Sequence, residues 1–383
     1  MIDNDLDKSQ ERALAVFGGD AVHGGDIWGW SRRLNKPVDE ILDLSASLNP
    51  LGPPPGLDQA IARAMSGICH YPDRLSYEFR ETLAGKLGTS ATCLLPGNGS
   101  TALIRMIARA LDLKNIVLLA PAFGEMARSL AIAGRHFHYL LTREQDGFVP
   151  TFHDLENLWD MEPSAVIFSN PTTPAGTLIP RDILDSIIER AARRRVWVVV
   201  DEAFIDFADE QARSWACEAM KRHKRLLVLR SLTKFFCIAG LRLGYAMADA
   251  DTLSDFAPLG QPWSVNTLAQ AAGVFCLGQD EYVQKTRESM DRWRREQTAA
   301  LDELGLGPMR GVANYLLCRL PGDGPTAAQV AAHTAQQGVL VRPAASFVGC
   351  GEHHLRVAVT TTEEQQRLLA ALRPALAQKV DRV

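Results

Sequence analysis

Short apolar runs recur through the middle of the chain and constrain its fold more than any other feature. The clearest are Ile116–Ala120, Ala165–Ser169 and Val196–Val200. Runs of this length and composition are typical of strands buried on both faces, as in parallel sheets. Helical patterns such as Arg181–Arg194 alternate with them, which predicts an α/β fold with a mostly parallel, doubly wound sheet. Sheets of this kind bind ligands at the carboxyl ends of their strands.

Each of the three runs leads to a residue that suits a bound aromatic ring. Asp201 follows the third run, and its carboxylate can pair with a protonated pyridine nitrogen. Asn170 follows the second run and can donate a hydrogen bond to a phenolic oxygen. Phe123 comes shortly after the first run, and its ring can stack on a pyridine face. Taken singly, Asn and Asp are also common strand-closing turn residues, and Phe is a common core residue.

A lysine with two neighbouring hydroxyls forms the most specific motif of the chain. Ser231, Thr233 and Lys234 lie within four residues, and Arg242 follows eight residues after the lysine. A nucleophilic amine beside hydroxyl and guanidinium donors can bond an aldehyde and hold a phosphate, which predicts a pyridoxal-phosphate (PLP) site. The alternative is that Lys234 is a solvated lysine in a turn, the usual situation of lysine.

The glycine-containing turn Pro96–Thr101 precedes a helical pattern at Ala102–Ala108. Its glycines let the backbone approach an anion, and Ser100 can cap the helix so that free first-turn amides point at a phosphate. A capped helix after such a turn is also ordinary architecture.

Together these segments resemble the fold-type I PLP-dependent enzymes, the aspartate aminotransferase superfamily, and within it the histidinol-phosphate aminotransferase branch. The resemblance covers almost the whole chain, and the matching residues occur in family order. It implies a large domain with the mostly parallel sheet, and a smaller α+β domain built from both chain ends. The expected boundaries are an N-terminal arm at 1–55, a PLP-binding domain at 56–290 and a C-terminal domain at 291–383.

The resemblance also implies roles for single residues. Lys234 would be the catalytic Schiff-base lysine, while Asp201, Asn170 and Phe123 would contact the ring. The residues implied to hold the cofactor phosphate are Asn98, Gly99, Ser100, Ser231, Thr233 and Arg242. In this family two subunits share each site, so the resemblance implies a homodimer in which Tyr71 reaches the neighbour's cofactor. Phe204 departs from the branch, because aminotransferases there usually carry tyrosine, and this puts simple transamination in doubt.

The N-terminal region resembles the family of L-threonine O-3-phosphate decarboxylases of cobalamin biosynthesis. The matching segments are Val22–Asp26 and Asp43–Pro54. They imply that His23, Gly24 and Asn49 contact the substrate. The alternative is a histidine in an arm without a ligand, followed by a plain Asn-Pro turn.

Two arginines near the C-terminus lie within strand-like runs, Arg342 in Val339–Pro343 and Arg356 in Leu355–Val359. Arg356 matches the arginine that binds the substrate anion in the family, whereas Arg342 could also be a surface residue of its strand. A substrate with a carboxylate and a phosphomonoester carries about three negative charges near neutral pH. Planar guanidinium groups bind both anions bidentately, so both arginines are predicted to bind substrate.

Three functions are open from the sequence. The first is PLP-dependent decarboxylation of threonine phosphate, or of serine phosphate, with aminopropanol phosphate as the product expected from threonine phosphate. The second is an aminotransferase acting on histidinol phosphate or a similar amino-phosphate. The third is a protein that binds PLP without catalysis, which the intact set of Lys234, Asp201, Asn170 and Arg242 argues against.

Composition narrows the possible partners. The net charge of −4 gives no general attraction to nucleic acid or membranes. No apolar run reaches membrane-spanning length and the first residues lack a signal-peptide pattern, so we expect a cytoplasmic protein. The seven cysteines form no Cys-x-x-Cys pair, and His353 and His354 point to opposite faces of a strand. We therefore expect no metal site.

Overall fold

The computed structural model describes residues 24–111 and 113–377, and its largest element is a seven-stranded sheet. In spatial order, the strands are β2 (Leu94–Asn98), β8 (Leu243–Met247), β7 (Leu226–Ser231), β6 (Trp197–Asp201), β5 (Ala165–Ser169), β3 (Ile116–Ala120) and β4 (Phe137–Leu141). Strands β4, β3, β5, β6 and β7 are parallel, whereas β8 runs antiparallel to both of its neighbours. The mostly parallel sheet predicted from the sequence is thus confirmed.

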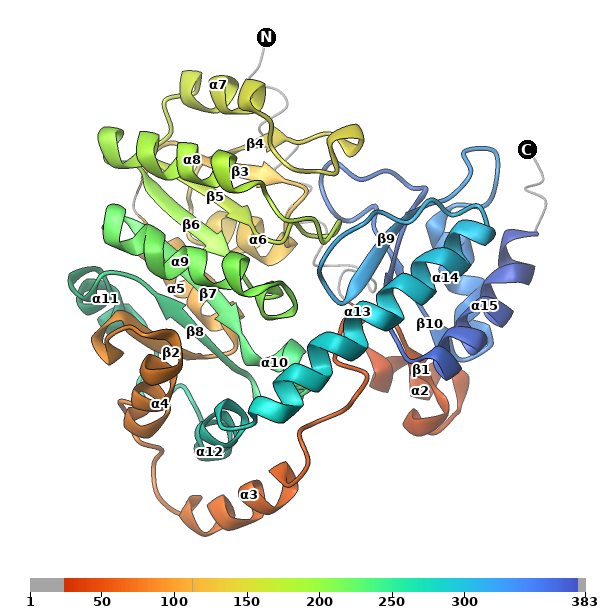
Figure 1. Cartoon of the computed structure of the whole chain (residues 1–383), viewed down its shortest axis with the longest axis horizontal. Helices are drawn as coiled ribbons and strands as arrows, with labels where there is room; N and C mark the ends of the chain where they lie inside the picture. The colour runs from red at the N-terminus through yellow and green to blue at the C-terminus, as the bar shows by residue number, and fades with distance from the viewer. Residues whose placement is uncertain (1–23, 112, 378–383) are drawn as a thin grey trace.

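Helices cover both faces of this sheet. Helices α8 (Arg181–Arg194) and α9 (Glu210–Arg222) lie on one face, and α5 (Ser100–Ala110) and α6 (Gly124–Ile132) lie on the other (Figure 1). Strands β3, β5, β7 and β8 are buried along their whole length, as expected between two helical layers. The first predicted strand and the predicted helix at 181–194 have the observed bounds.

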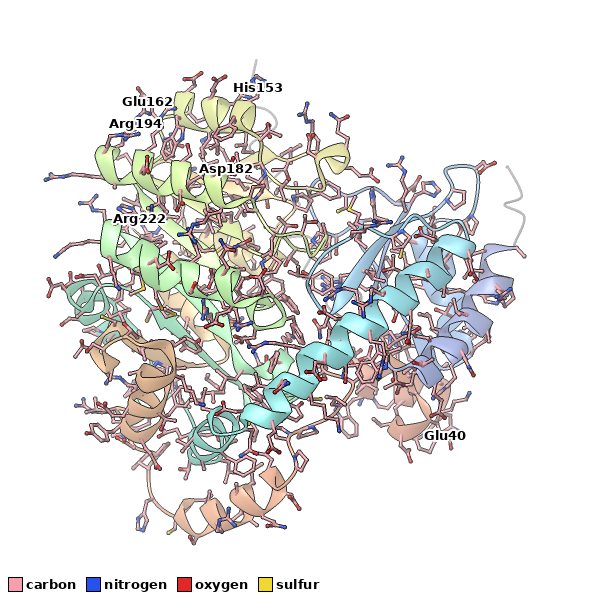
Figure 2. The ribbon with its side chains drawn as sticks, viewed as in Figure 1. Glu40, His153, Glu162, Asp182, Arg194 and Arg222 are labelled. Atoms are coloured by element: carbon pink, nitrogen blue, oxygen red, sulfur yellow. The ribbon has the colours of Figure 1, made fainter. Side chains whose placement is uncertain are left out.

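Charged residues help to define where these helices end. Figure 2 shows Arg194 and Arg222, which are the last residues of α8 and α9. Cations stabilise the negative end of a helix dipole. Arg222 also pairs with Asp185 of α8 at 2.5 Å, so it joins the two helices. The carboxyl ends of the strands lie at the opposite edge and stay available for a site.

The second unit is smaller and uses segments from both ends of the described chain. Strands β9 (Tyr315–Arg319), β12 (His354–Ala358) and β11 (Arg342–Pro343) form an antiparallel sheet. Strand β1 (Leu42–Asp43) pairs in parallel with β10 (Val339–Leu340). Helix α13 (Asp280–Glu303) runs between the two units (Figure 1). The predicted boundary at residue 290 falls inside α13, which is continuous from Asp280 to Glu303. The domain boundaries at 55 and 290 remain predictions.

The remaining α-helices complete the layers around these sheets. They are α2 (Ile27–Leu34), α3 (Leu57–Ala64), α4 (Tyr77–Leu87), α7 (Phe152–Asp160), α10 (Leu232–Phe235), α11 (Ala250–Phe256), α12 (Thr267–Leu277), α14 (Ala327–Gln336) and α15 (Thr362–Leu376). None of the described helices combines the length and apolar composition needed to cross a membrane.

Two local predictions need correction. The run at 339–343 is two short strands in different sheets, because the chain leaves β1 after Leu340 and joins β12 at Arg342. Ser100 does not cap α5 but is its first residue, because Gly99 occupies the cap position.

Candidate active site

Lys234 lies on α10, the short helix that follows β7 directly, so the sheet places it at a strand's carboxyl end. Burial of the amine is the main reason that its pKa falls from 10.5 to about 8. Four other charged groups also act on the Lys234 pKa: Arg356, Arg242 and Arg342 lower it, and Asp201 raises it. The structure therefore brings together residues that lie more than 150 positions apart in the chain.

Asp201 is the last residue of β6, and its carboxylate lies among buried groups. Burial raises its pKa to about 6, whereas the Ala203 amide and the charge of Lys234 act to lower it. The Ala203 amide donates to Asp201 Oδ1 at 3.0 Å and fixes the carboxylate. A group with this pKa is mostly ionised at neutral pH, as a partner for a protonated ring nitrogen must be.

Asn170 follows β5 beside Asp201, and its backbone amide donates to the Asp201 carbonyl at 2.9 Å. The Asn170 side chain is almost completely buried. Its Oδ1 accepts a hydrogen bond from the Ile179 amide at 3.0 Å. This bond orients the side-chain amide, so Nδ2 is the atom left to donate to a ring oxygen.

Gly99 and Arg242 lie against each other where β2 meets α5. Gly99 has φ +72° and ψ 160°, a conformation essentially restricted to glycine. A Cβ on Gly99 would lie 2.6 Å from Arg242 Nη2, so a side chain there would displace the guanidinium. Arg242 has a positive φ of 59°, and its Nη1 donates to the Ala239 carbonyl at 3.2 Å. Backbone strain of this kind persists where the surroundings enforce it, often at ligand sites.

Other predicted phosphate ligands adjoin this contact. Asn98 ends β2, and Ser100 begins α5, whose first turn offers amides to an anion. A Cβ on Gly244 would lie 2.8 Å from the Ser100 nitrogen, so β8 packs closely against this turn. Ser231 Oγ and Thr233 Oγ1 form a hydrogen bond of 2.6 Å beside Lys234. These groups suit a phosphate monoester.

Arg342 and Arg356 occupy directly opposite positions on β11 and β12. Residues paired in this way share one face of the sheet, with Cβ atoms about 5 Å apart. Burial lowers the pKa of both guanidinium groups, and the charge of Arg356 lowers that of Arg342 further. Arg356 Nη2 donates to the Ser45 carbonyl at 3.1 Å, while its Nε is buried without a hydrogen-bond partner among the described residues. Like charges held together in this way favour an anionic ligand.

Aromatic rings support the two arginines. The Arg342 guanidinium lies 4.3 Å from the Phe347 ring centroid, and the Arg356 guanidinium lies 5.0 Å from the Tyr315 centroid. Tyr315 also contacts Phe204 edge-on, with centroids 4.9 Å apart. No sequence motif marks Tyr315 or Phe347 as site residues. Both are aromatic residues in the C-terminal region, but their contacts depend on strand register and not on a motif.

The predicted N-terminal substrate residues have different outcomes. A Cβ on Gly24 would lie 2.1 Å from the Ser45 oxygen, the same atom that Arg356 contacts, so Gly24 lies close to the arginine pair. His23 lies outside the described residues. Asn49 is buried, and its Nδ2 lies within 3.0 Å of the Phe235 carbonyl and of the Tyr282 and Thr286 hydroxyls. Its amide hydrogens are thus already donated, which supports a structural role for Asn49.

Phe123 lies at the sheet edge that carries the site, whereas Tyr71 lies on the surface of the protein. Phe123 precedes α6, shortly after β3, which places it on the same edge of the sheet as Asn170 and Asp201. Tyr71 is 79 % exposed and stacks on Trp263 with centroids 4.7 Å apart. An exposed aromatic pair of this kind is available to a second molecule.

Comparison with known proteins identifies the family of this chain. Residues 39–372 match the family model for aminotransferase class I and II. The chain belongs to this family. It is 34 % identical to threonine-phosphate decarboxylase of Salmonella typhimurium, covering 95 % of this chain and 98 % of that protein. It is 30 % identical to histidinol-phosphate aminotransferase 1 of Cupriavidus pinatubonensis, covering 95 % of each.

The fold comparison agrees. The structure of histidinol-phosphate aminotransferase from Sinorhizobium meliloti in complex with pyridoxal-5'-phosphate superposes with a TM-score of 0.83 at 19 % identity, covering 91 % of this chain and 93 % of that one. The predicted fold-type I architecture is therefore confirmed. PLP is the cofactor that the family implies, and the residues of the site fit it. The Lys234 amine is buried and has a lowered pKa, and the Asp201 carboxylate is mostly ionised at neutral pH. Gly99 has no Cβ and therefore leaves room beside Arg242.

The lowered pKa of Lys234 predicts how cofactor capture depends on pH. Only the neutral amine attacks an aldehyde, so the rate of PLP uptake by cofactor-free protein should rise with pH, reach half of its maximum at about pH 8 and level off at higher pH. Arg356→Gln removes a charge that lowers this pKa, so its midpoint should move to higher pH. Stopped-flow absorbance measures the rate, with the exposed Arg193→Ala as control. A wild-type midpoint near the ordinary lysine value of 10.5 would contradict the assignment.

Proposed function

We propose that this chain is a PLP-dependent decarboxylase that converts L-threonine O-3-phosphate to (R)-1-amino-2-propanol O-2-phosphate and CO2 in cobalamin biosynthesis. The observation that carries the proposal is the opposed pair Arg342 and Arg356, whose charges act on Lys234. The similarity to the Salmonella typhimurium protein over nearly the whole chain supports it. Serine phosphate, which lacks one methyl group, is the alternative substrate, and such a difference is worth only about 1–3 kcal/mol.

The arginine pair suits a substrate with two anionic groups. Threonine phosphate carries a carboxylate and a phosphomonoester, with about three negative charges together near neutral pH. The buried Arg356 and the half-buried Arg342 supply bidentate donors to such groups, and their mutual repulsion falls when an anion lies between them. Gly24 lies at the same place and lets the N-terminal backbone approach the bound anion closely.

Each residue around the cofactor then has a defined task. When bound, PLP supplies an electron sink for the electron pair released as a bond to the substrate Cα breaks. Asp201 keeps a proton on the ring nitrogen, Asn170 donates to the ring oxygen, and Phe123 covers one ring face. Asn98, Gly99, Ser100, Ser231, Thr233 and Arg242 hold the phosphate. Lys234 binds the cofactor and, once its amine is free, can return a proton to Cα after CO2 leaves.

An aminotransferase of the histidinol-phosphate type, using 2-oxoglutarate and glutamate, is the second candidate. It is favoured by the 30 % identity to the Cupriavidus pinatubonensis enzyme. Phe204 counts against it, because its ring packs on Tyr315 and offers no hydroxyl in a position where aminotransferases of this branch usually have tyrosine.

Incubation of the PLP-loaded protein with threonine phosphate, in the absence of any keto acid, separates the two candidates. The proposal predicts one CO2 and one aminopropanol phosphate for each substrate consumed, because decarboxylation needs no amino acceptor. Headspace CO2 analysis with mass spectrometry of the product measures both. Lys234→Ala is the matched inactive control. No CO2, but amino transfer after addition of 2-oxoglutarate, would identify an aminotransferase.

We further propose a cytoplasmic homodimer with shared active sites. All seven cysteines are free in the described structure, which suits a reducing compartment. Large apolar side chains are exposed along one stretch of the chain and beside it: Met65, Ile68, Tyr71, Leu75, Tyr77 and Trp263. Exposed apolar patches of this kind are typical of interaction surfaces.

Two measurements test the shared site. Sedimentation analysis should give a mass twice the 42.0 kDa of one chain. Tyr71→Phe should weaken PLP binding in the dimer, because it removes a hydroxyl that would reach the partner's cofactor phosphate. The nearby Tyr77→Phe serves as a control for loss of an exposed hydroxyl. A monomeric active enzyme, or wild-type PLP affinity in Tyr71→Phe, would contradict this assignment.

A further inference from the structure

A second cavity lies between α5 and α6, and it shares no lining residue with the site around Lys234. Its volume is about 170 Å³, the space of roughly five to six water molecules at ~30 Å³ each. Its lining combines three arginines with one hydroxyl and an apolar side: Arg105, Arg109, Arg128, Ser129, Ile132 and Ala133. A cavity of this size fits a small anion with a few carbon atoms.

The positive charge of this cavity is only partly neutralised. Glu125 is buried, and its Oε1 lies 3.0 Å from Arg105 Nη2 and 3.3 Å from Arg128 Nη1. One carboxylate therefore orients two guanidinium groups. Among the described residues, Glu125 is the only acidic group paired with Arg105, and none is paired with Arg109, so positive charge remains on the α5 side of the cavity.

Arg109 and Ser129 are the groups that point most directly to a missing ligand. The guanidinium of Arg109 forms no hydrogen bond or ion pair with the described residues. Ser129 is 3 % exposed, and its Oγ has no hydrogen-bond partner among them. A buried hydroxyl without a partner is costly, and serine can usually find one on its own helix. Both groups line the same cavity.

The arginines are not needed to neutralise the end of α5. Arg135 already serves that purpose, since it donates to the Ala108 carbonyl at 3.2 Å and to the Arg109 carbonyl at 2.8 Å. Arg105 and Arg109 lie five and nine residues after Ser100, or about 8 and 14 Å along the helix at 1.5 Å per residue. They are therefore also too far along α5 to belong to the phosphate-binding turn at Gly99.

We propose that this cavity is a second anion site, which binds a small phosphate-bearing molecule independently of the catalytic site. The phosphate lies between the Arg105 and Arg109 guanidinium groups and accepts a hydrogen bond from Ser129 Oγ. Any organic part lies against Ile132 and Ala133. Arginine forks bind phosphate oxygens bidentately.

Isothermal titration of the PLP-loaded enzyme with inorganic phosphate at low salt tests the proposal. Wild type should bind one phosphate per chain more than the double variant Arg105→Ala/Arg109→Ala. Ser129→Ala should weaken that binding event by about 10-fold to 100-fold, because it removes one hydrogen bond to a charged group. Turnover of the catalytic substrate should stay at the wild-type level in both variants. A parallel titration with glycerol 3-phosphate distinguishes a phosphate ester from the free ion, since the ester also contacts the apolar side.

Arg193→Ala/Arg295→Ala is the matched control, because it removes two exposed arginines elsewhere and changes the net charge equally. It should leave both phosphate affinity and stoichiometry unchanged. Ser129→Ala removes a hydroxyl that has no hydrogen-bond partner among the described residues. If Ser129 had only a structural role, this variant would bind phosphate as tightly as the wild type. The proposal would be overturned if wild type and Arg105→Ala/Arg109→Ala bound the same number of phosphate ions per chain with the same affinity. This holds for any number of phosphate ions that the two proteins share.

Discussion

Two arginines placed opposite one another, Arg356 buried and Arg342 half-buried, are the constraint on which much of this structure depends. Their like charges repel each other, and burial reduces the amount of water that can screen them. The fold tolerates the pair because aromatic faces of Phe347 and Tyr315 and the Ser45 carbonyl lie against it. Ser45 reaches β12 because β1 pairs with β10, so the N-terminal segment must join the C-terminal unit for this site to exist.

The same charges connect substrate binding to the chemistry at Lys234. Each arginine lowers the pKa of the lysine amine, and burial lowers it further, to about 8. An anion bound to the arginines would offset their charge and raise that pKa again. A free lysine amine would then hold a proton more readily when substrate is present, which is what proton return to Cα requires. Asp201 stays ionised under the same conditions, because its pKa is about 6.

Local sequence signals predicted the elements of the large sheet but not the contacts between distant segments. The runs at 116–120 and 165–169 and the helix at 181–194 have the predicted bounds, because burial pattern and length define them locally. The motif around Asn49 does not predict that its amide contacts Tyr282 and Thr286, more than 230 residues later, and its contact with substrate stays a prediction. Tyr315 and Phe347 were not predicted, because their contacts also join distant segments of the chain. Their role arises from the register of β9, β11 and β12, which no single segment encodes.

Kinetics of Arg342→Gln and Arg356→Gln with threonine phosphate and with threonine would test the role of the arginine pair most directly. Each substitution should lower kcat/KM for threonine phosphate by about 10-fold to 100-fold, since a hydrogen bond to a charged group is worth ~1.5–3 kcal/mol. The variant that has lost the phosphate ligand should also lose the preference for threonine phosphate over threonine, whereas the other should lose activity with both. Wild-type kcat/KM in both variants, matching the exposed control Arg193→Ala, would contradict the claim that this pair binds the substrate anions.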